Sequence, residues 1–310
     1  MEKSEIRKDY FLDKYVIIAP KRAKRPQRIE KIPETDAACP FCPEKLDSAH
    51  TFTYRDNNEN GEWEIASIKN DFPAVSEDNP RAYGAQEVII ETRRHGMDIN
   101  EFSTDHIVRV LNAYIDRYEA LRNLDKIKHV VLFKNEGGKA GASIGHTHSQ
   151  IIALPILPPK VEAEAEAYNR YRLENASCPY CDIIKQESGK SRVIWEDENL
   201  FVLAPYASDS PYGAWFLPKR HIRKISELNY EEKESIAKAL KLTLGILDEL
   251  GISYNYFVEN EISCEDYHLN IKLAPRPNVW AGLELGTGVI INSIPPEMAA
   301  KVYRGEIKIK

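Results

Sequence analysis

The feature that most constrains the fold is a cysteine pattern that occurs twice. Cys39-Pro40-Phe41-Cys42 and Cys178-Pro179-Tyr180-Cys181 share the spacing C-P-aromatic-C. Each pair is followed by a predicted strand that ends in basic residues and a histidine, and later by a second histidine. These histidines are His95 and His146 in the first copy, and His221 and His268 in the second. We therefore predict two divergent copies of one unit, at residues 1–157 and 158–310, separated at a proline-rich stretch.

Hydrophobic periodicity within each copy indicates the fold class. A helix is predicted over 104–124, where apolar residues lie on one face, and another from Asn229, with Glu232 as a capping-box partner, to just before Gly251. Short apolar, β-rich runs predict strands at 15–19, 88–90, 130–133, 151–154, 193–196, 201–204, 214–217, 254–258 and 268–273. Clustered strands with one long helix in each half predict an α+β protein with antiparallel-rich sheets.

Composition narrows the class of ligand. The chain has 310 residues and a formal net charge of −6, and 43% of its residues are hydrophobic, which is typical of a folded globular protein. No stretch approaches the ~18 apolar residues of a membrane span, and the first ten residues alternate charges where a signal peptide needs an apolar run. We expect a cytoplasmic protein with no membrane partner. A mildly acidic chain is also poorly suited to nucleic acid, so small ligands are expected.

The repeated pattern predicts two metal sites. Two thiolates and two imidazoles suit tetrahedral zinc, and four protein ligands leave no open position, so both sites are expected to be structural. A redox-active CxxC is the alternative, but Cys39 follows a proline-containing loop where a redox pair normally follows a strand. His221 has the alternative of a solvated residue in a basic run, and His268 that of a core histidine. The predicted zinc ligands are Cys39, Cys42, His95 and His146 in the first set, and Cys178, Cys181, His221 and His268 in the second.

A glycine-rich segment followed by a histidine motif carries the predicted chemistry. Small residues over 137–142 allow the backbone to approach a phosphate group, and the HxHxQ motif His146-Thr147-His148-Ser149-Gln150 then begins a strand. Alternate residues of a strand share a face, so His146, His148 and Gln150 should point the same way. Near the start of the chain, Arg22 and Arg25 are suited to binding phosphate oxygens, with a solvated basic loop as the alternative.

With these motifs the sequence resembles the histidine-triad superfamily, in particular the galactose-1-phosphate uridylyltransferase branch and its relatives that phosphorylyse nucleotide sugars. The resemblance rests on the segments RAKRP, CPFC, KNDFPA, ETRRH and HTHSQ and extends over almost the whole chain. It implies two histidine-triad-like halves, a homodimer, metal at the first ligand set, and His148 as the nucleophile. Asn135, Ser143 and Glu284 match the family's site positions for orienting the histidine, contacting phosphate and binding the hexose.

Gln150 favours nucleotidyl transfer over hydrolysis. Hydrolytic members of the superfamily have a third histidine at this position, which can protonate an alcohol or amine leaving group. A sugar phosphate leaves as a stable anion, so a neutral amide that hydrogen-bonds a phosphoryl oxygen is sufficient. In the second half Asn270 replaces the nucleophile, and that half is expected to contribute structure and sugar contacts.

We therefore predict a uridylyltransferase that converts UDP-glucose and galactose 1-phosphate by a ping-pong mechanism through uridylyl-His148, with nucleotide sugar and hexose 1-phosphate as ligands. Phe72 offers an apolar face to a pyrimidine, and Asn70 and Asp71 lie beside it, although a plain turn is the alternative for this segment. One competing function is an ADP-sugar phosphorylase or adenylyltransferase using the same histidine. Another competing function is a non-catalytic nucleotide-binding module that is stabilised by zinc.

Overall fold

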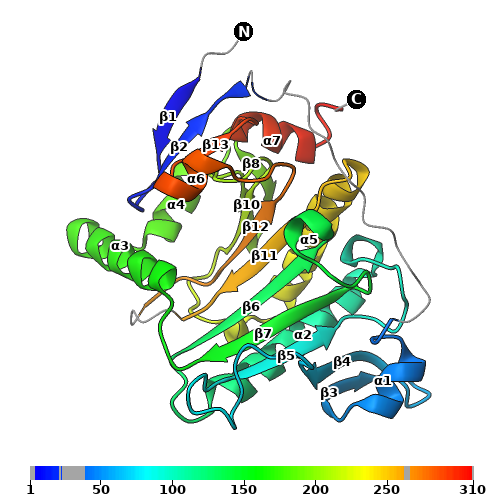
Figure 1. Cartoon of the computed structure of the whole chain (residues 1–310). Coiled ribbons are helices and arrows are strands. Elements are labelled where there is room, and N and C mark those ends of the chain that lie inside the picture. Colours follow the sequence, from blue (N-terminus) through cyan, green and yellow to red (C-terminus); the bar gives the residue numbers. More distant parts are fainter. Residues whose placement is uncertain (1–3, 21, 23–38, 262–265, 309–310) are drawn as a thin grey trace.

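A large antiparallel sheet organises the chain. The computed structural model describes residues 4–20, 22, 39–261 and 266–308. Within these residues ten strands form one sheet in the order β3-β4-β5-β7-β6-β11-β12-β10-β9-β8 (Figure 1). Its strands are β3 (Phe52–Asn57), β4 (Trp63–Lys69), β5 (Ala85–Ile90), β6 (His129–Glu136), β7 (His148–Leu154), β8 (Val193–Glu196), β9 (Leu200–Leu203), β10 (Ala214–Pro218), β11 (Tyr254–Glu259) and β12 (Asn270–Pro275). A separate three-stranded sheet contains β1 (Glu5–Lys8), β2 (Tyr15–Ile18) and β13 (Ile290–Asn292).

The strand order of the large sheet is symmetric about its centre. Strands β6 and β11 pair antiparallel in the middle, and on each side the remaining strands follow in the corresponding order. Both halves of the chain therefore contribute to one continuous sheet and share the core on one face of it. The position of the boundary at residue 157 remains a prediction.

Helices cover both faces of the sheet. They are α1 (Pro43–Ala49), α2 (Thr104–Arg122), α3 (Pro159–Asn175), α4 (Pro179–Glu187), α5 (Tyr230–Glu249), α6 (Gly282–Thr287) and α7 (Pro296–Tyr303). Helices α2 and α5 pack against each other and bury their apolar faces in the main core, together with residues from strands of both halves. On the opposite face, α1 packs over β4 and β5, while α3 and α4 pack over β9 and β10 (Figure 1).

The predicted fold class is confirmed, and the boundaries of the elements follow the sequence signals closely. Ser103 caps α2, and Asn229 caps α5 in a reciprocal capping box with Glu232. The prediction of one long helix in each half is wrong for the second half, which contains α3 as well as α5. Hydrophobic periodicity does not indicate α3, because its apolar positions are mostly alanines placed among glutamates. In the part of the chain that is described, no helix is long and apolar enough to cross a bilayer.

Candidate active site and metal centres

The structure brings the first predicted ligand set together. Cys39 and Cys42 lie at the start of α1, and the Nδ1 atom of His146 lies 3.7 and 3.8 Å from their respective sulfurs. The Nδ1 atom of His95 lies 3.7 Å from the sulfur of Cys42. Ligands at ~2.3 Å (sulfur) and ~2.0 Å (nitrogen) from a tetrahedral zinc ion lie roughly 3.5 Å apart. The donor set and its spacing therefore fit a metal ion.

The second predicted ligand set has the same arrangement. Cys178 and Cys181 lie at the start of α4, and the Nδ1 atom of His268 lies 3.7 and 3.4 Å from their sulfurs. The Nδ1 atom of His221 is 3.3 Å from the sulfur of Cys181. In each set all four donor atoms lie within 4.8 Å of one another. Both groups are thus suited to hold a metal ion.

Hydrogen bonds on the far side of two imidazoles orient the donor atoms inward. His146 donates from Nε2 to the Thr92 carbonyl oxygen at 2.7 Å, and His268 donates from Nε2 to the Pro218 carbonyl oxygen at 2.9 Å. A proton on Nε2 leaves the lone pair on Nδ1, the atom that faces the cysteines. Both histidines are therefore fixed in the tautomer that a metal ion requires.

Strand β7 places His148 and Gln150 on one face of the sheet. This is the face covered by α1, and the ring of Phe41 lies edge-on to the His148 ring with centroids 5.1 Å apart. His148 is buried, and the amide of Gln150 accepts a hydrogen bond from Gln86 at 3.1 Å. The predicted common orientation of His148 and Gln150 agrees with the alternation of the strand.

The imidazole of His148 has a defined tautomer. Its Nδ1 atom lies 2.8 Å from the carbonyl oxygen of His146, so Nδ1 carries the proton and the lone pair is on Nε2. Burial lowers the pKa of His148, although this hydrogen bond opposes the shift. A neutral imidazole with an unprotonated Nε2 is a suitable nucleophile toward phosphorus.

The glycine-rich segment is a compact turn between β6 and β7. Gly137 adopts a φ of +77°, and a Cβ atom there would lie 2.4 Å from the Ser253 hydroxyl oxygen, so the close packing requires glycine. The side-chain amide of Asn255 donates to Asn135 Oδ1 and to the Ala140 carbonyl oxygen, both at 2.8 Å. The predicted site residue Asn135 is therefore held by β11, while Ser143 is exposed at the end of the turn.

Two predicted ligand-binding residues line a separate cavity. Arg22 and Glu284 contribute to a cavity of about 370 Å³ that also contains Lys139 of the glycine-rich segment and Trp280. Glu284 belongs to α6, and its carboxylate accepts a hydrogen bond from the Ala281 backbone at 2.9 Å. The cavity lining does not include His148. Arg25, the other predicted phosphate ligand, lies outside the described residues.

The predicted base-binding segment follows β4. Asn70 accepts a hydrogen bond from the Phe72 backbone at 2.8 Å, which makes a tight turn. Asp71 lies 3.6 Å from the imidazole of His50, which ends α1, so the segment adjoins the helix that follows the first CxxC pair. The ring of Phe72 is 92% exposed and is available for contact with a ligand.

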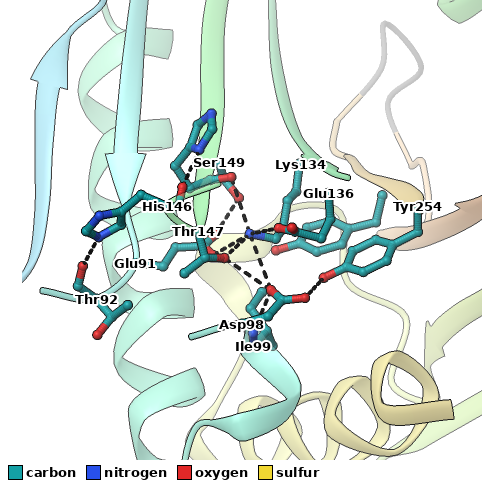
Figure 2. A network of polar contacts seen from close by, with 12 residues as sticks. Glu91, Thr92, Asp98, Ile99, Lys134, Glu136, His146, Thr147, Ser149 and Tyr254 are labelled. Carbon is teal, nitrogen blue, oxygen red and sulfur yellow. Dashed lines mark hydrogen bonds and ion pairs between the residues drawn. The ribbon is translucent and has the colours of Figure 1, made fainter. Parts of the chain in front are cut away.

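A buried network on the other face of β7 was not predicted from sequence. Lys134 of β6 forms a 2.8 Å ion pair with Glu91, and both side chains are fully buried (Figure 2). Burial alone raises the pKa of Glu91, but attraction to Lys134 and hydrogen bonds from it and from Ser149 lower it overall. Two features of the sequence could have indicated this network. One is a lysine within the apolar run of β6, and the other is the pair of polar residues Thr147 and Ser149, which alternate with His148 in the HxHxQ motif.

The C-terminal half contains a second buried Lys–Glu pair, which lies on the other face of the sheet, the one covered by α3 and α4. Asn270 stands where the first half has His148, and Lys272 stands where it has Gln150. The ammonium group of Lys272 lies 2.6 and 2.7 Å from the two carboxylate oxygens of Glu164, which extends from α3. The position equivalent to Gln150 thus takes part in an internal ion pair in the second half.

Comparison with known proteins gives consistent relatives over the whole chain. Residues 21–157 match a family profile described as "Domain of unknown function (DUF4931) N-terminal domain". The chain is 30% identical to the ADP-glucose phosphorylase of Arabidopsis thaliana, over 97% of this chain and 92% of the relative. It is 28% identical to the galactose-1-phosphate uridylyltransferase of Thermotoga maritima, over 97% of this chain and 98% of the relative.

Solved structures show the same two groups. The crystal structure of an ADP-glucose phosphorylase from Arabidopsis thaliana with bound ADP-glucose superposes with a TM-score of 0.87 at 30% identity, covering 99% of this chain and 100% of that one. A structure of a uridylyltransferase superposes with a TM-score of 0.76 at 26% identity, covering 98% of each chain.

Proposed function

The chain belongs to the galactose-1-phosphate uridylyltransferase family of nucleotidyltransferases, since a member from Haemophilus influenzae is 30% identical over 74% of this chain and 70% of the relative. From this we propose that it transfers UMP from UDP-glucose to galactose 1-phosphate through a covalent adduct on His148. The observation that carries the proposal is the geometry of His148. Its Nδ1–H is held by the His146 carbonyl oxygen at 2.8 Å, which directs the lone pair to Nε2. The relative from T. maritima, matched over 98% of its length, supports the uridylyl group and the hexose 1-phosphate acceptor.

The proposed reaction has two balanced displacements. Nε2 of His148 attacks the α-phosphorus of UDP-glucose, forming a P–N bond while the bond to the bridging oxygen breaks, and glucose 1-phosphate leaves as an anion that needs no proton. A phosphate oxygen of galactose 1-phosphate then attacks the same phosphorus. The P–N bond breaks, its electron pair returns to Nε2, and UDP-galactose is released.

Other residues of the first half have supporting roles in this proposal. Gln150 shares the face of His148, and its amide N–H is suited to a phosphoryl oxygen that gains charge in the transition state. The turn at 137–142 brings backbone close to the phosphates, with Ser143 exposed at its end. Arg22 and Lys139 add positive charge beside the cavity that contains Glu284, the proposed hexose ligand.

We also propose that both Cys/His sets hold zinc. Two sulfurs and two nitrogens complete a tetrahedral shell, so the metal stabilises the fold and takes no direct part in the transfer. In the first set the ligand His146 also accepts the Nδ1–H of His148 through its carbonyl oxygen. Loss of this metal is therefore expected to disturb the nucleophile as well as the fold.

A homodimer is part of the proposal. Apolar side chains on and before α6 are exposed beside the cavity that contains Glu284; they are Val279, Trp280, Leu283 and Leu285. A group of this kind, with large apolar side chains beside charged ones, is typical of an interface. Light scattering on the purified protein tests the dimer, and a monomer at micromolar concentration contradicts it.

A second candidate function is ADP-glucose phosphorolysis, in which inorganic phosphate attacks adenylyl-His148 and releases ADP. The similarity to the A. thaliana enzyme with bound ADP-glucose, at a TM-score of 0.87, favours it. The chemistry on His148 is the same in both candidates, and only the base and the acceptor differ. A site that satisfies the polar edge of one base leaves groups unpaired with the other, which costs about 1–3 kcal/mol for each group.

Labelling with the two nucleotide sugars separates the candidates. The protein is mixed with UDP-glucose or ADP-glucose carrying ³²P in the α-phosphate, and the protein-bound label is followed over time. We expect UDP-glucose to label the protein at least about tenfold faster. Equal rates, or faster labelling by ADP-glucose, support the second candidate. No label from either compound on folded protein that carries its zinc contradicts both.

A further inference from the structure

The buried Lys134–Glu91 pair lies directly beneath the proposed nucleophile, on the opposite face of the sheet. Lys134 is directly opposite Ser149 in the pairing of β6 with β7, and Glu91 follows the last residue of β5, which pairs with His148. We propose that this pair is a positioning device that fixes the backbone of residues 147–149 and thereby aims His148 at the phosphorus. The inference rests on the proposed function, because it assigns a role in the same transfer.

The pair contacts three consecutive residues of the motif. The Lys134 ammonium lies 2.5 Å from the Thr147 hydroxyl oxygen and 3.4 Å from the His148 carbonyl oxygen. The Glu91 carboxylate accepts hydrogen bonds from the Ser149 hydroxyl at 2.5 Å and from the Thr147 hydroxyl at 3.2 Å. The residues on both sides of the nucleophile, Thr147 and Ser149, are therefore held by the pair (Figure 2), and the His148 carbonyl group is held by Lys134.

The same network connects the nucleophile to the first metal ligand set. The backbone N–H of Glu91 donates to the Thr147 carbonyl oxygen at 3.3 Å, and the next residue, Thr92, accepts the Nε2–H of His146 at 2.7 Å. His146 in turn accepts the Nδ1–H of His148 through its carbonyl oxygen. Displacement of Glu91 would thus shift the backbone of Thr147 and the His146 carbonyl group that orients the His148 ring.

The remaining partners of the pair come from α2, from the loop that contains Asp98, 3.8 Å from the Lys134 ammonium, and from the end of β6 itself. Tyr114 of α2 donates to the Glu91 carboxylate and lies 2.6 Å from the Ser149 hydroxyl. Asp98 accepts from Thr147 at 3.1 Å and from Tyr254 at 2.9 Å, and Glu136 lies 3.4 Å from the Lys134 ammonium. Charged groups of this kind are an inefficient way to stabilise a core, since apolar residues of similar size often serve as well. Their directional contacts to the motif are what an apolar core would not provide.

This geometry also gives Ser149 a role. Its side chain is fully buried and points toward α2, on the opposite face from His148 and Gln150. Ser149 therefore cannot touch the nucleotide base, and its hydroxyl serves the Glu91–Lys134 network. A serine at this position therefore forms part of the buried network and does not select between uracil and adenine.

The test compares two double variants that each remove one buried Lys–Glu pair. Lys134→Met with Glu91→Gln removes the pair beneath His148. Lys272→Met with Glu164→Gln is the control, because it removes the other buried Lys–Glu pair, which lies in the second half near Asn270, where no nucleophile exists. Both replacements remove two opposite charges together, so neither leaves the partner charge buried alone. Each variant is characterised by urea unfolding, by the dissociation constant for UDP-glucose, and by the single-turnover rate of adduct formation at saturating UDP-glucose.

We expect the first variant to bind UDP-glucose within about threefold of wild type but to form the adduct at least about tenfold more slowly, because small misplacements of a nucleophile cost large factors in rate. The control variant should form it within about twofold of wild type. If the first variant does not fold, Thr147→Val takes its place, and Thr147→Ser, which keeps the hydroxyl, should recover the rate that Thr147→Val loses.

The outcomes separate this inference from the proposed function. A wild-type protein that forms no adduct with UDP-glucose or ADP-glucose overturns the proposed function and the inference with it. If the wild-type protein forms the adduct, the proposed function stands. If the folded first variant, or Thr147→Val, then forms the adduct at the wild-type rate, only the positioning role is overturned. Equal slowing of the two double variants also overturns it, because the effect is then a general loss of rigidity.

Discussion

Replacement of Lys272 by methionine tests the burial of the Lys272–Glu164 pair. In the wild type the Glu164 carboxylate accepts hydrogen bonds from Lys272 and from the hydroxyls of Tyr180 and Tyr267, at distances from 2.6 to 2.7 Å. Lys272 and Glu164 are only 8% and 5% exposed. Removing one partner of such a pair leaves a buried charge uncompensated and costs about 3–5 kcal/mol. That is a large share of the ~5–15 kcal/mol by which a typical domain is stable.

The stability lost by Lys272→Met should increase as the pH rises above 4.5. Burial alone would raise the pKa of Glu164, but attraction to Lys272 lowers it from 4.5 to about 2, so above pH 4.5 the wild-type carboxylate is charged whether folded or unfolded. Without Lys272, burial raises this pKa above 4.5, and the folded variant holds a proton that the unfolded chain releases. Each pH unit above 4.5 then adds up to ~1.4 kcal/mol to the cost, until the raised pKa is reached.

Urea unfolding of wild type and Lys272→Met at pH 5 and pH 7, with zinc present in both buffers, measures this difference. We expect the variant to lose about 3–5 kcal/mol at pH 7 and about 2 kcal/mol less at pH 5. Lys272→Met combined with Glu164→Gln should recover most of the loss at pH 7. If Lys272→Met alone loses less than about 1 kcal/mol at pH 7, as variants of exposed ion pairs do, the pair does not act as a buried ion pair.

The remaining predictions concern the metal sites and one buried histidine. Protein purified without added metal should contain two zinc ions per chain, and Cys39→Ser should lose one of them and unfold at a lower urea concentration. One ion or none in the wild type would contradict metal binding by the second set. Iron in place of zinc would contradict the identity of the metal. His129 is 7% exposed, and burial lowers its pKa from 6.5 to about 4, so the folded state excludes a proton that the unfolded chain binds. Stability should therefore fall by about 3 kcal/mol as the pH drops from 6.5 to 4, and His129→Gln should remove this part of the acid sensitivity; parallel stability curves for the two proteins would contradict the assignment.

The sequence carried the local signals of this fold well. The repeated spacing of Cys and His predicted two ligand sets, and the structure brings the members of each set together. In the chain, each CxxC pair is far from the two histidines of its set. Strand alternation correctly placed His148 and Gln150 on one face. These inferences succeeded because a period of two and a CxxC spacing are properties of the chain itself.

Spacing and periodicity could not predict the contacts between elements that are distant in the chain. Lys134 lies in a strand and Glu91 just past the end of another, and Glu164 reaches Lys272 from a helix more than one hundred residues away. A buried lysine looks the same in sequence as a solvated one, and only the tertiary structure supplies its carboxylate. The cavity with Arg22 and Glu284 is likewise assembled from opposite ends of the chain, so its separation from His148 could not be read from the motifs.

The proposed role of His148 as carrier of the nucleotidyl group can be tested by intact-protein mass spectrometry of the trapped half-reaction. Wild-type protein is mixed with UDP-glucose, or in parallel with ADP-glucose, without acceptor, then quenched in base, where a phosphoramidate survives, and digested to locate the modification. We expect the added nucleotidyl mass on the peptide containing His148, its loss on mild acid treatment, and its absence in His148→Asn, which should still bind the nucleotide sugar nearly as well as wild type. An adduct on another residue, or one that persists in His148→Asn, would contradict the account.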